Sequence, residues 1–332
     1  MLTVSNNVSP TDARRTTSDE ARSPVVSVLM TVYNGEKYIV EAVDSILNQT
    51  YTDLEFIVID DGSTDNTANI LRDLAANDPR LKVYTEKNRG IARSMNHALR
   101  LAKGEFVAKM DADDVSLPKR LEVQVKYLRE HPEVVGLGSA WEVIDDAGRL
   151  LTALHPPTDD QNVQAELLKG HGAITHACGL MRREELIAAG SYDETFDVAE
   201  DLDMWLRLGE RGKLENLPQV LVQYRIHNSS VSEQRCRDQR EYARRACELA
   251  WKRRGISGTF EAEHLWRAGT NDGAKYEFLL RHGWWAFNSA QRSTALLYGV
   301  KAISVRPLRP DGWRLFVCAA IKKMHRQPAV RQ

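Results

Sequence analysis

Short apolar runs alternate with amphipathic helical patterns over the first 130 residues of this 332-residue chain, and this alternation restricts its fold more than any other feature. The apolar runs, each typical of a strand buried on both faces of a sheet, are Val25–Val32, Leu54–Ile59, Leu81–Tyr84 and Phe106–Met110. Between the runs, apolar residues recur with helical spacing, as Ile39, Val43 and Ile46 do after the first one. Alternating strands and helices form βαβ units, so the sequence predicts a doubly wound, mostly parallel α/β sheet flanked by helices.

The pattern changes after residue 134. Further expected elements are a strand at Val134–Val143, helices at Gln161–Lys169 and Glu200–Leu208, and a last strand at Val220–Ile226. After about Ser232 the strand signals end, and segments 275–288, 291–305 and 311–323 are predicted to form helical hairpins. We therefore expect a disordered N-terminal lead over residues 1–23, an α/β domain over residues 24–235 and a helical C-terminal extension over residues 236–332.

The composition limits which binding partners and which cellular compartment are expected for this chain. A net charge of −1 gives no general electrostatic attraction to nucleic acid, so we expect no nucleic-acid partner. The four cysteines are scattered without a C-x-x-C pair, which is typical of a reducing compartment and argues against a disulfide framework or a structural zinc site. No apolar run approaches the roughly 18 residues that a membrane span needs. The first 23 residues lack the apolar core of a signal peptide, so we expect a cytoplasmic protein.

Polar residues follow three of the expected strands at the point where each strand ends. The loops are Thr31-Val32-Tyr33-Asn34-Gly35, Asp60-Asp61-Gly62-Ser63 and Asp111-Ala112-Asp113. In a doubly wound sheet, the C-terminal ends of the strands form the edge where ligands bind. The first loop offers an aromatic face and small polar groups, the second offers carboxylates that accept hydrogen bonds, and the third offers metal ligands. Together they suit a nucleotide, although a turn is the usual role of a lone Asp-Gly-Ser.

The third loop carries three carboxylates, Asp111, Asp113 and Asp114, within four residues. Carboxylates this close repel one another, and a bound divalent cation usually relieves the repulsion. An Asp-x-Asp pair (a DXD motif) can hold Mn²⁺ or Mg²⁺ while phosphate oxygens and water fill the other coordination positions. On these residues alone, a solvated acidic turn is an equal alternative.

A nucleotide at this edge needs its phosphates neutralised. The chain contains neither G-x-G-x-x-G after the first strand nor G-x-x-x-x-G-K-[ST], so metal and side chains must do this. Basic candidates are Lys87, Arg89 and Arg93, each of which taken alone is more typical of a solvated surface charge. His227, just after the last expected strand, is a further candidate metal ligand or phosphate contact, with a packed or surface histidine as the alternative.

Five segments of the chain resemble glycosyltransferase family 2. They are Val-Ser-Val-Leu-Met-Thr-Val-Tyr-Asn-Gly, Ser-Ile-Leu-Asn-Gln-Thr, Val-Ile-Asp-Asp-Gly-Ser-Thr-Asp, Asn-Arg-Gly-Ile-Ala and Met-Asp-Ala-Asp-Asp, within a match from about Pro24 to Ser232. The resemblance implies a GT-A fold, a nucleotide-sugar donor, usually of uridine or thymidine diphosphate, and Mn²⁺ or Mg²⁺. The Q-x-x-R-W motif of processive members is absent, which makes a polymer-extruding synthase an unfavourable interpretation.

The resemblance also assigns roles to single residues. It implies base contacts by Thr31, Tyr33 and Asp61, with Asp60 beside them. It implies a ribose contact by Asp111 and a metal contact by Asp113.

The resemblance further places the catalytic base in Glu200-Asp201, and we expect Asp201 to fill that role. Inverting transfer needs a carboxylate that takes the proton of the acceptor hydroxyl as it attacks the anomeric carbon opposite the leaving diphosphate. The alternative for Glu200, Asp201 and Asp203 is that acids favour the N-terminus of a helix. Asp203 is expected to be simply exposed.

The sequence therefore predicts an inverting, metal-dependent, hexosyltransferase-like enzyme. Its donor is expected to be a UDP or dTDP sugar and its acceptor a glycan or lipid-linked hydroxyl, in cell-surface polysaccharide synthesis. A nucleotidyltransferase is one alternative, but the first loop lacks the basic phosphate-binding residues that it needs. A catalytically inactive nucleotide-binding scaffold is the other.

The C-terminal segment Trp313–Arg331 mixes apolar residues with lysines and arginines. A basic amphipathic helix can lie on an anionic membrane surface, which suits a lipid-linked acceptor, so peripheral contact with the inner face of the membrane is one hypothesis. A terminal helix packed on its neighbours is the alternative.

Overall fold

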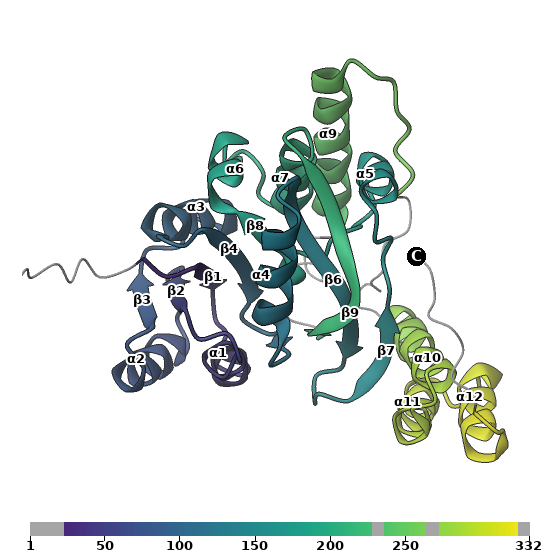
Figure 1. Ribbon diagram of the computed structural model, residues 1–332. Coiled ribbons are helices and arrows are strands. Elements are labelled where there is room, and N and C mark those ends of the chain that lie inside the picture. The colour runs from purple at the N-terminus through teal and green to yellow at the C-terminus, as the bar shows by residue number, and fades with distance from the viewer. Residues whose placement is uncertain (1–22, 228–235, 263–271, 325–332) are drawn as a thin grey trace, which may run out of the picture.

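A computed structural model describes residues 23–227, 236–262 and 272–324 (Figure 1). Apart from Ser23, the expected N-terminal lead lies outside the described residues, as does the end of the chain after Met324.

The centre of the molecule is a nine-stranded sheet with the order β3-β2-β1-β4-β8-β6-β9-β5, in which β7 pairs with β6. The strands are β1 Val26–Val32, β2 Leu54–Asp60, β3 Leu81–Thr85, β4 Phe106–Asp111, β5 Val115–Ser116, β6 Val134–Ile144, β7 Leu150–Leu154, β8 Leu180–Arg182 and β9 Lys213–Arg225. The long ladders β3-β2-β1-β4 and β6-β9 are parallel, and the short ladders of β5, β7 and β8 are antiparallel. The predicted mostly parallel α/β sheet is confirmed.

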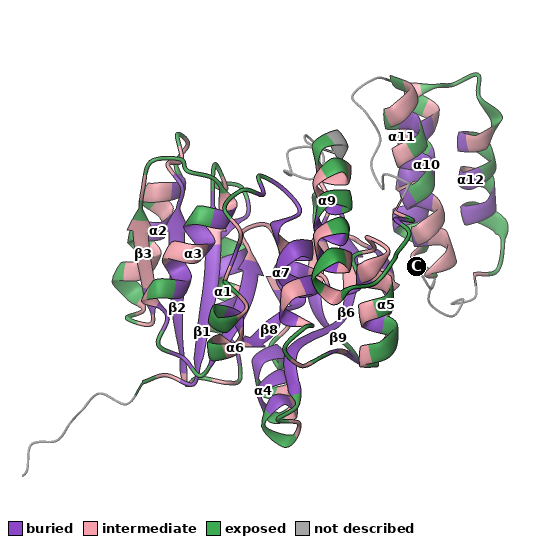
Figure 2. Cartoon of the chain, turned by 90° about the horizontal axis from the view of Figure 1, so that it is seen from above, coloured by how far each residue is buried: buried purple, intermediate pink, exposed green. Residues whose placement is uncertain are grey.

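Helices cover both faces of this sheet, and the last three helices of the chain lie beside it (Figure 1). They are α1 Ile39–Leu47, α2 Thr67–Asn77, α3 Ile91–Leu101, α4 Arg120–Glu130, α5 Asp160–Leu168, α6 Arg183–Ala188, α7 Glu200–Leu208, α9 Cys236–Arg254, α10 Asp272–Asn288, α11 Arg292–Val305 and α12 Pro310–Ile321, with a 3₁₀ turn at His176–Cys178. Alternate residues of a strand enter different cores: Leu29 packs in the cluster that contains α3 and α7, whereas Val28 and Met30 pack in the cluster with α1 and α4. This burial on both faces explains the continuous apolar run of β1 (Figure 2).

The sequence missed the short antiparallel elements. Strands β5, β7 and β8 and helix α6 were not predicted, because segments of two to six residues carry too little periodicity. Strand β9 begins at Lys213, seven residues before the predicted start at Val220. Its first half contains Pro218, which cannot donate a ladder hydrogen bond, and its register against β6 shifts near this residue, opposite Ala140.

The helices after the sheet pack in two places. Helix α9 lies against α7 and α5 and buries Ala246, Cys247 and Ala250 in the core of the α/β part. Helices α10, α11 and α12, which match the three predicted helical segments, form a separate cluster with Trp141 and Leu151 at the β6–β7 edge. Figure 2 shows these three helices beside the sheet.

Candidate functional site

The three loops identified above leave one edge of the sheet. Strands β2, β1 and β4 are adjacent and parallel, and their register aligns Ile59, Thr31 and Asp111. The carboxyl ends of these strands therefore place the loops side by side, as the sequence predicts for a ligand-binding edge.

The second loop holds two buried carboxylates with different partners. Asp61 accepts hydrogen bonds from the backbone N–H groups of Arg89 at 2.8 Å and Gly90 at 2.9 Å, so it fixes the loop before α3. Asp60 accepts one from the N–H of Ser63 at 3.0 Å, while its Oδ2 is buried without a partner among the described residues. A carboxylate has about four acceptor sites, so Asp61 retains capacity for a further donor.

The first loop presents one aromatic ring to solvent. The Tyr33 side chain is 52% exposed. The next residue, Asn34, has a positive φ of 55°, and it is held by hydrogen bonds from its N–H to Ser63 Oγ at 2.9 Å and from Thr64 N–H to its Oδ1 at 2.8 Å. Asn34 thus joins the first loop to the second, whereas Tyr33 leaves an open face on which a planar ring can stack.

In the third loop, Asp111 is paired with a buried lysine. Lys109 Nζ lies 2.5 Å from Asp111 Oδ1, and the lysine side chain has no exposed surface. Burial alone would raise the pKa of the Asp111 carboxyl, but the neighbouring charge of Lys109 brings it below its usual value. Asp111 is therefore held ionised. Sequence reasoning missed Lys109, although a lysine inside an apolar strand is itself a signal of a buried ion pair.

Asp113, in the loop after β4, contacts His227, which follows β9. Their Oδ2 and Nε2 atoms are 2.8 Å apart, and the His227 ring lies 5.0 Å from the Tyr38 ring. Asp114 is buried and accepts the N–H of Arg225 at 2.8 Å through Oδ1, while its Oδ2 has no partner among the described residues. Burial, followed by the charges of Asp113 and Asp111, raises the pKa of Asp114 well above its usual value.

This donor set fits a divalent cation as a partial site. A carboxylate, an imidazole and a nearby buried carboxylate oxygen are acceptable to Mn²⁺, and such sites commonly take their remaining ligands from substrate phosphates and water. Among residues 23–227, 236–262 and 272–324, no group of three or more His, Cys, Asp and Glu side chains is arranged to hold a metal by itself.

Two further acids begin α7. Ala199 has a left-handed φ of 58° immediately before the helix, and Glu200 and Asp201 occupy its first turn. Burial, reinforced by the charge of Asp201, raises the pKa of Glu200 to about 8. Burial also raises the pKa of Asp201, and the charge of Asp111 adds to the effect, so Asp201 and Asp111 lie within electrostatic range of one another. Asp203, which the sequence suggested to be exposed, is buried and paired with Arg207 at 2.7 Å.

A histidine and a tyrosine that sequence reasoning left without a role line the same region. His176 Nε2 lies 2.9 Å from the Tyr192 hydroxyl, and both side chains are buried. Burial and the charge of Lys109 lower the pKa of His176 to about 3, so the imidazole is neutral at physiological pH. No local motif marks these residues, because a long-range contact brings them together.

Arg93 takes a different partner from the one expected of a phosphate contact. It lies on α3 and forms an exposed ion pair with Glu194 at 3.2 Å. The structure thus places it at the outer surface, between α3 and the segment before α7.

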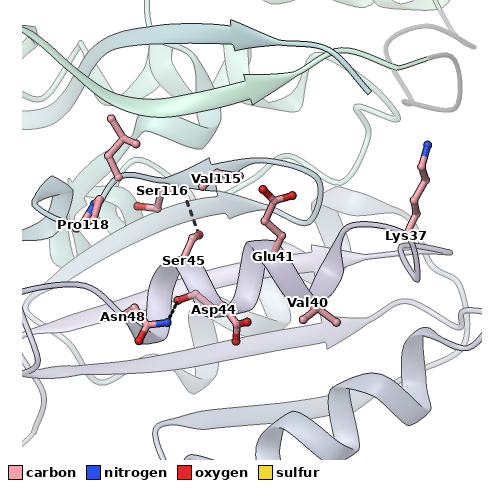
Figure 3. A pocket seen from close by; sticks show the side chains of 10 residues that line it. Lys37, Val40, Glu41, Asp44, Ser45, Asn48, Val115, Ser116 and Pro118 are labelled. Carbon is pink, nitrogen blue, oxygen red and sulfur yellow. Dashed lines mark hydrogen bonds between the residues drawn. The ribbon is translucent and has the colours of Figure 1, made fainter. Parts of the chain in front are cut away.

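A shallow groove of about 560 Å³ runs between α1 and β5. Figure 3 shows Glu41 and Ser45 of α1, with Asn48 just after the helix, on one side and Val115 and Ser116 on the other. None of the predicted donor or metal contacts lines it, and the Ser116 N–H to Ser45 Oγ hydrogen bond of 3.0 Å joins its two walls. We assign this groove no chemistry.

Comparison with known sequences identifies relatives. The sequence profile described as Glycosyl transferase family 2 matches residues 27–188. An uncharacterized glycosyltransferase of Haemophilus influenzae is 34% identical over 234 residues, covering 67% of this chain and 72% of that protein. The O-antigen biosynthesis glycosyltransferase WbnJ of Escherichia coli is 34% identical over 212 residues, covering 62% and 82%. The amylovoran biosynthesis glycosyltransferase AmsE of Erwinia amylovora is 32% identical over 213 residues, covering 63% and 79%.

Solved structures share the fold. S. aureus TarS 1-349 in complex with UDP-GlcNAc superimposes with a TM-score of 0.56 at 21% identity, over 89% of this chain and 87% of that one. The mannosyltransferase PcManGT of Pyrobaculum calidifontis in complex with GDP-Man and Mn²⁺ gives 0.53 at 21% identity, over 90% and 81%. A longer TarS structure is matched over only 52% of its length. At these identities the likeness establishes the GT-A fold, as predicted, with helices at the C-terminus.

Within the part of the chain that the structure describes, no helix is both long enough and apolar enough to cross a membrane.

Proposed function

Because the chain belongs to glycosyltransferase family 2, we propose that it is an inverting, metal-dependent glycosyltransferase that moves a hexose from a UDP or dTDP sugar to a glycan or lipid-linked hydroxyl. One observation carries the proposal: the alignment of β2, β1 and β4 brings three polar loops to one edge, with the acids of α7 within electrostatic range.

The donor's nucleoside would lie across the first two loops. The exposed ring of Tyr33 provides a stacking surface for the base, with Thr31 at the end of β1 beside it. Asp61 accepts a base N–H with the lone pairs that Arg89 and Gly90 leave free. Asp111, held ionised by Lys109, accepts a ribose hydroxyl hydrogen bond.

The diphosphate would lie against the third loop. Asp113 and His227 would hold Mn²⁺ or Mg²⁺, together with phosphate oxygens of the donor. Such a cation neutralises the charge that develops on the leaving diphosphate. The Mn²⁺ in the PcManGT structure supports the use of a divalent cation, and the UDP-GlcNAc of TarS supports a uridine donor.

Asp201 would act as the base. It accepts the proton of the acceptor hydroxyl while the hydroxyl oxygen bonds to the anomeric carbon and the bond from that carbon to the diphosphate oxygen breaks. A single displacement of this kind inverts the anomeric configuration. The raised pKa of Asp201 makes it a stronger base than an exposed aspartate, and Glu200, with a pKa of about 8, keeps its proton and stays neutral beside it.

The similarity to WbnJ, an O-antigen biosynthesis glycosyltransferase, and to AmsE, an amylovoran biosynthesis glycosyltransferase, supports a role in cell-surface polysaccharide synthesis, which we place at the cytoplasmic face of the membrane. A lipid-linked acceptor would bring the protein to that face.

Calorimetric titration of UDP, dTDP, GDP and CDP, with and without Mn²⁺, tests the proposal on wild-type protein and on Asp113→Ala. We expect one diphosphate to bind, with an affinity that depends on both Mn²⁺ and Asp113. Asp73→Ala, which removes an exposed acid of α2, is the matched control and should bind like the wild type. If no nucleotide binds under any condition, the proposed site is wrong.

A further inference from the structure

Helix α12 has an apolar face that no described residue covers. Trp313, Val317 and Ile321 are 49%, 47% and 76% exposed, and their spacing of four places them along one side of the helix. The other side is well packed, because Leu315 and Ala319 are fully buried against α10 and α11. The exposed residues therefore form a stripe on the outside of the three-helix cluster, where α12 lies at the edge in Figure 2.

The stripe continues into the turn before the helix. Leu308 is 97% exposed, the highest value of any large apolar residue in the part of the chain that the structure describes. The Trp313 indole N–H donates to the Pro307 carbonyl at 2.9 Å, which holds the turn against the indole. We call Leu308, Trp313, Val317 and Ile321 the outer apolar face. Apolar residues that gather on a surface in this way mark an interaction site.

The surroundings of the outer apolar face are basic. Residues 300–324 contain six lysines and arginines against one acid, Asp311; the basic residues are Lys301, Arg306, Arg309, Arg314, Lys322 and Lys323. None of these six forms an ion pair with another described residue. Their charge is therefore available to an external anionic surface, in a chain whose net charge is only −1.

A chain of contacts links the three-helix cluster to the metal side of the proposed donor site. The Tyr298 hydroxyl of α11 donates to Asp145 Oδ2 at 3.2 Å. The next residue, Asp146, accepts a hydrogen bond from the Tyr38 hydroxyl, and the Tyr38 ring lies tilted against the His227 ring, with 5.0 Å between the ring centroids. A surface bound by α12 would thus lie at the far end of a chain of contacts that runs through α11 and Asp145 to the metal side of the site.

We propose that the outer apolar face docks α12 onto an anionic lipid bilayer, with the apolar side chains among the lipid tails and the surrounding lysines and arginines at the phosphate headgroups. An amphipathic helix with a basic surround has the composition that such binding requires. A bilayer fits better than a protein groove because the apolar residues and the cations extend over the turn, the helix and its C-terminal end. The proposal deepens the proposed function, since it locates a lipid-linked acceptor, and it rests on that function for the acceptor but not for lipid binding.

Sedimentation of the full chain with vesicles tests the proposal. We expect binding to phosphatidylglycerol-containing vesicles that weakens with salt, and little binding to pure phosphatidylcholine vesicles. The triple variant Trp313→Ser/Val317→Ser/Ile321→Ser should lose at least about tenfold in partitioning, because it removes the apolar contacts. Ile187→Ser, which changes an equally exposed apolar residue on α6, should partition like the wild type.

A charge variant separates the two contributions. Lys322→Glu/Lys323→Glu leaves the outer apolar face intact and should reduce the preference for phosphatidylglycerol, whereas Lys126→Glu on α4 should not. Equal partitioning of wild-type and triple-variant protein would overturn the proposal. The proposal would also be overturned if the wild type were a dimer and the triple variant a monomer, because a second copy of the chain would then cover the outer apolar face.

Nucleotide titration of the same proteins keeps the two proposals apart. If the triple variant binds the nucleotide normally and loses the vesicles, its fold is intact and the lipid result stands. If no protein binds a nucleotide but the wild type still sediments with anionic vesicles, the proposed function fails and the membrane surface remains supported.

Discussion

The turn after β4 and the first turn of α7 both carry adjacent acids, yet the surroundings of these acids differ. In the turn, Asp113 is partly exposed and paired with His227, and Asp111 is paired with Lys109. At the start of α7, Glu200 and Asp201 are both raised in pKa, chiefly by burial. Acids with nearby cationic or metal-binding partners suit binding, and buried acids with raised pKa values suit proton transfer.

The difference follows from where each pair lies in the fold. Asp113 follows a parallel strand whose C-terminal end opens at the sheet edge, so a ligand can reach it. Glu200 is buried and Asp201 is partly buried at the start of a helix whose later residues, such as Trp205, lie in the core, so both acids are shielded in part from water. A group of neighbouring acids in the sequence therefore does not by itself predict a binding role or a proton-transfer role, because the burial of each side chain decides between them.

Asp201→Asn gives the largest expected effect and tests the α7 half of the comparison. The amide keeps the Oδ1 that accepts the Leu202 N–H at 2.8 Å, so the fold is retained, but it cannot take a proton. We expect kcat to fall by about 10²- to 10⁴-fold, the usual contribution of a general base, with donor affinity unchanged. Steady-state kinetics and calorimetry measure the two quantities. Unaltered turnover would remove Asp201 from the role of base.

Asp113→Ala tests the binding role that we propose for the acids of the turn after β4. Removing a carboxylate ligand should weaken metal-dependent diphosphate binding by about 10- to 100-fold, or roughly 1.4 to 2.8 kcal/mol. Binding measured without Mn²⁺ should change little, because the nucleoside contacts come from the first two loops. Asp73→Ala provides the control. If Asp113→Ala lowered kcat without changing metal-dependent affinity, the two acidic regions would not be divided as we propose.

The two regions also differ in how far the sequence predicted them. Residues 25–130 form regular βαβ units, so local periodicity located the strands along the chain, and the doubly wound fold then predicted the edge that carries Asp61, Asp111 and Asp113. The sheet also contains antiparallel strands of two to five residues, β5, β7 and β8, and the pairing of a strand as short as Val115–Ser116 depends on distant residues of β9.

The same limit applies to individual side chains. The acids could be placed at strand and helix ends, but the burial of Asp203 and its pair with Arg207 could not be read from a run of acids. Likewise, the hydrogen bond between His176 and Tyr192 joins residues sixteen positions apart, with β8 and α6 between them, and no spacing rule predicts it.

His227→Asn sharpens the binding half with a smaller expected effect. The Asn amide retains polarity but is a weaker ligand for a transition metal than imidazole, so we expect Mn²⁺ affinity to fall by about tenfold, within the range seen when groups around a metal are changed. The loss for Mg²⁺, which prefers oxygen ligands, should be smaller. Metal titrations in the presence of the diphosphate measure both. An equal loss for the two metals would argue that His227 orients Asp113 without contacting the cation.

The last expected effect concerns stability and not turnover or binding, and it tests whether burial sets the protonation state of Glu200. The pKa of Glu200 is raised from the ordinary 4.5 to about 8 in the folded protein, so the folded state holds this proton more tightly than the unfolded state. Its contribution to stability is complete below about pH 4.5 and is lost as the pH rises through about 8. At about 1.4 kcal/mol for each pKa unit, the shift from 4.5 to about 8 corresponds to a change of up to about 5 kcal/mol.

Glu200→Gln carries no such proton, so its free energy of unfolding should fall less than that of the wild type between pH 5 and about pH 8.5. Urea unfolding of both proteins in metal-free buffer at the two pH values measures the difference. Glu184→Gln, at an exposed position of α6, should keep the pH dependence of the wild type. If the free energy of unfolding had the same pH dependence in the wild type and in Glu200→Gln, Glu200 would be ionised in the folded protein. The contrast between the acids of α7 and those of the turn after β4 would then fail for α7.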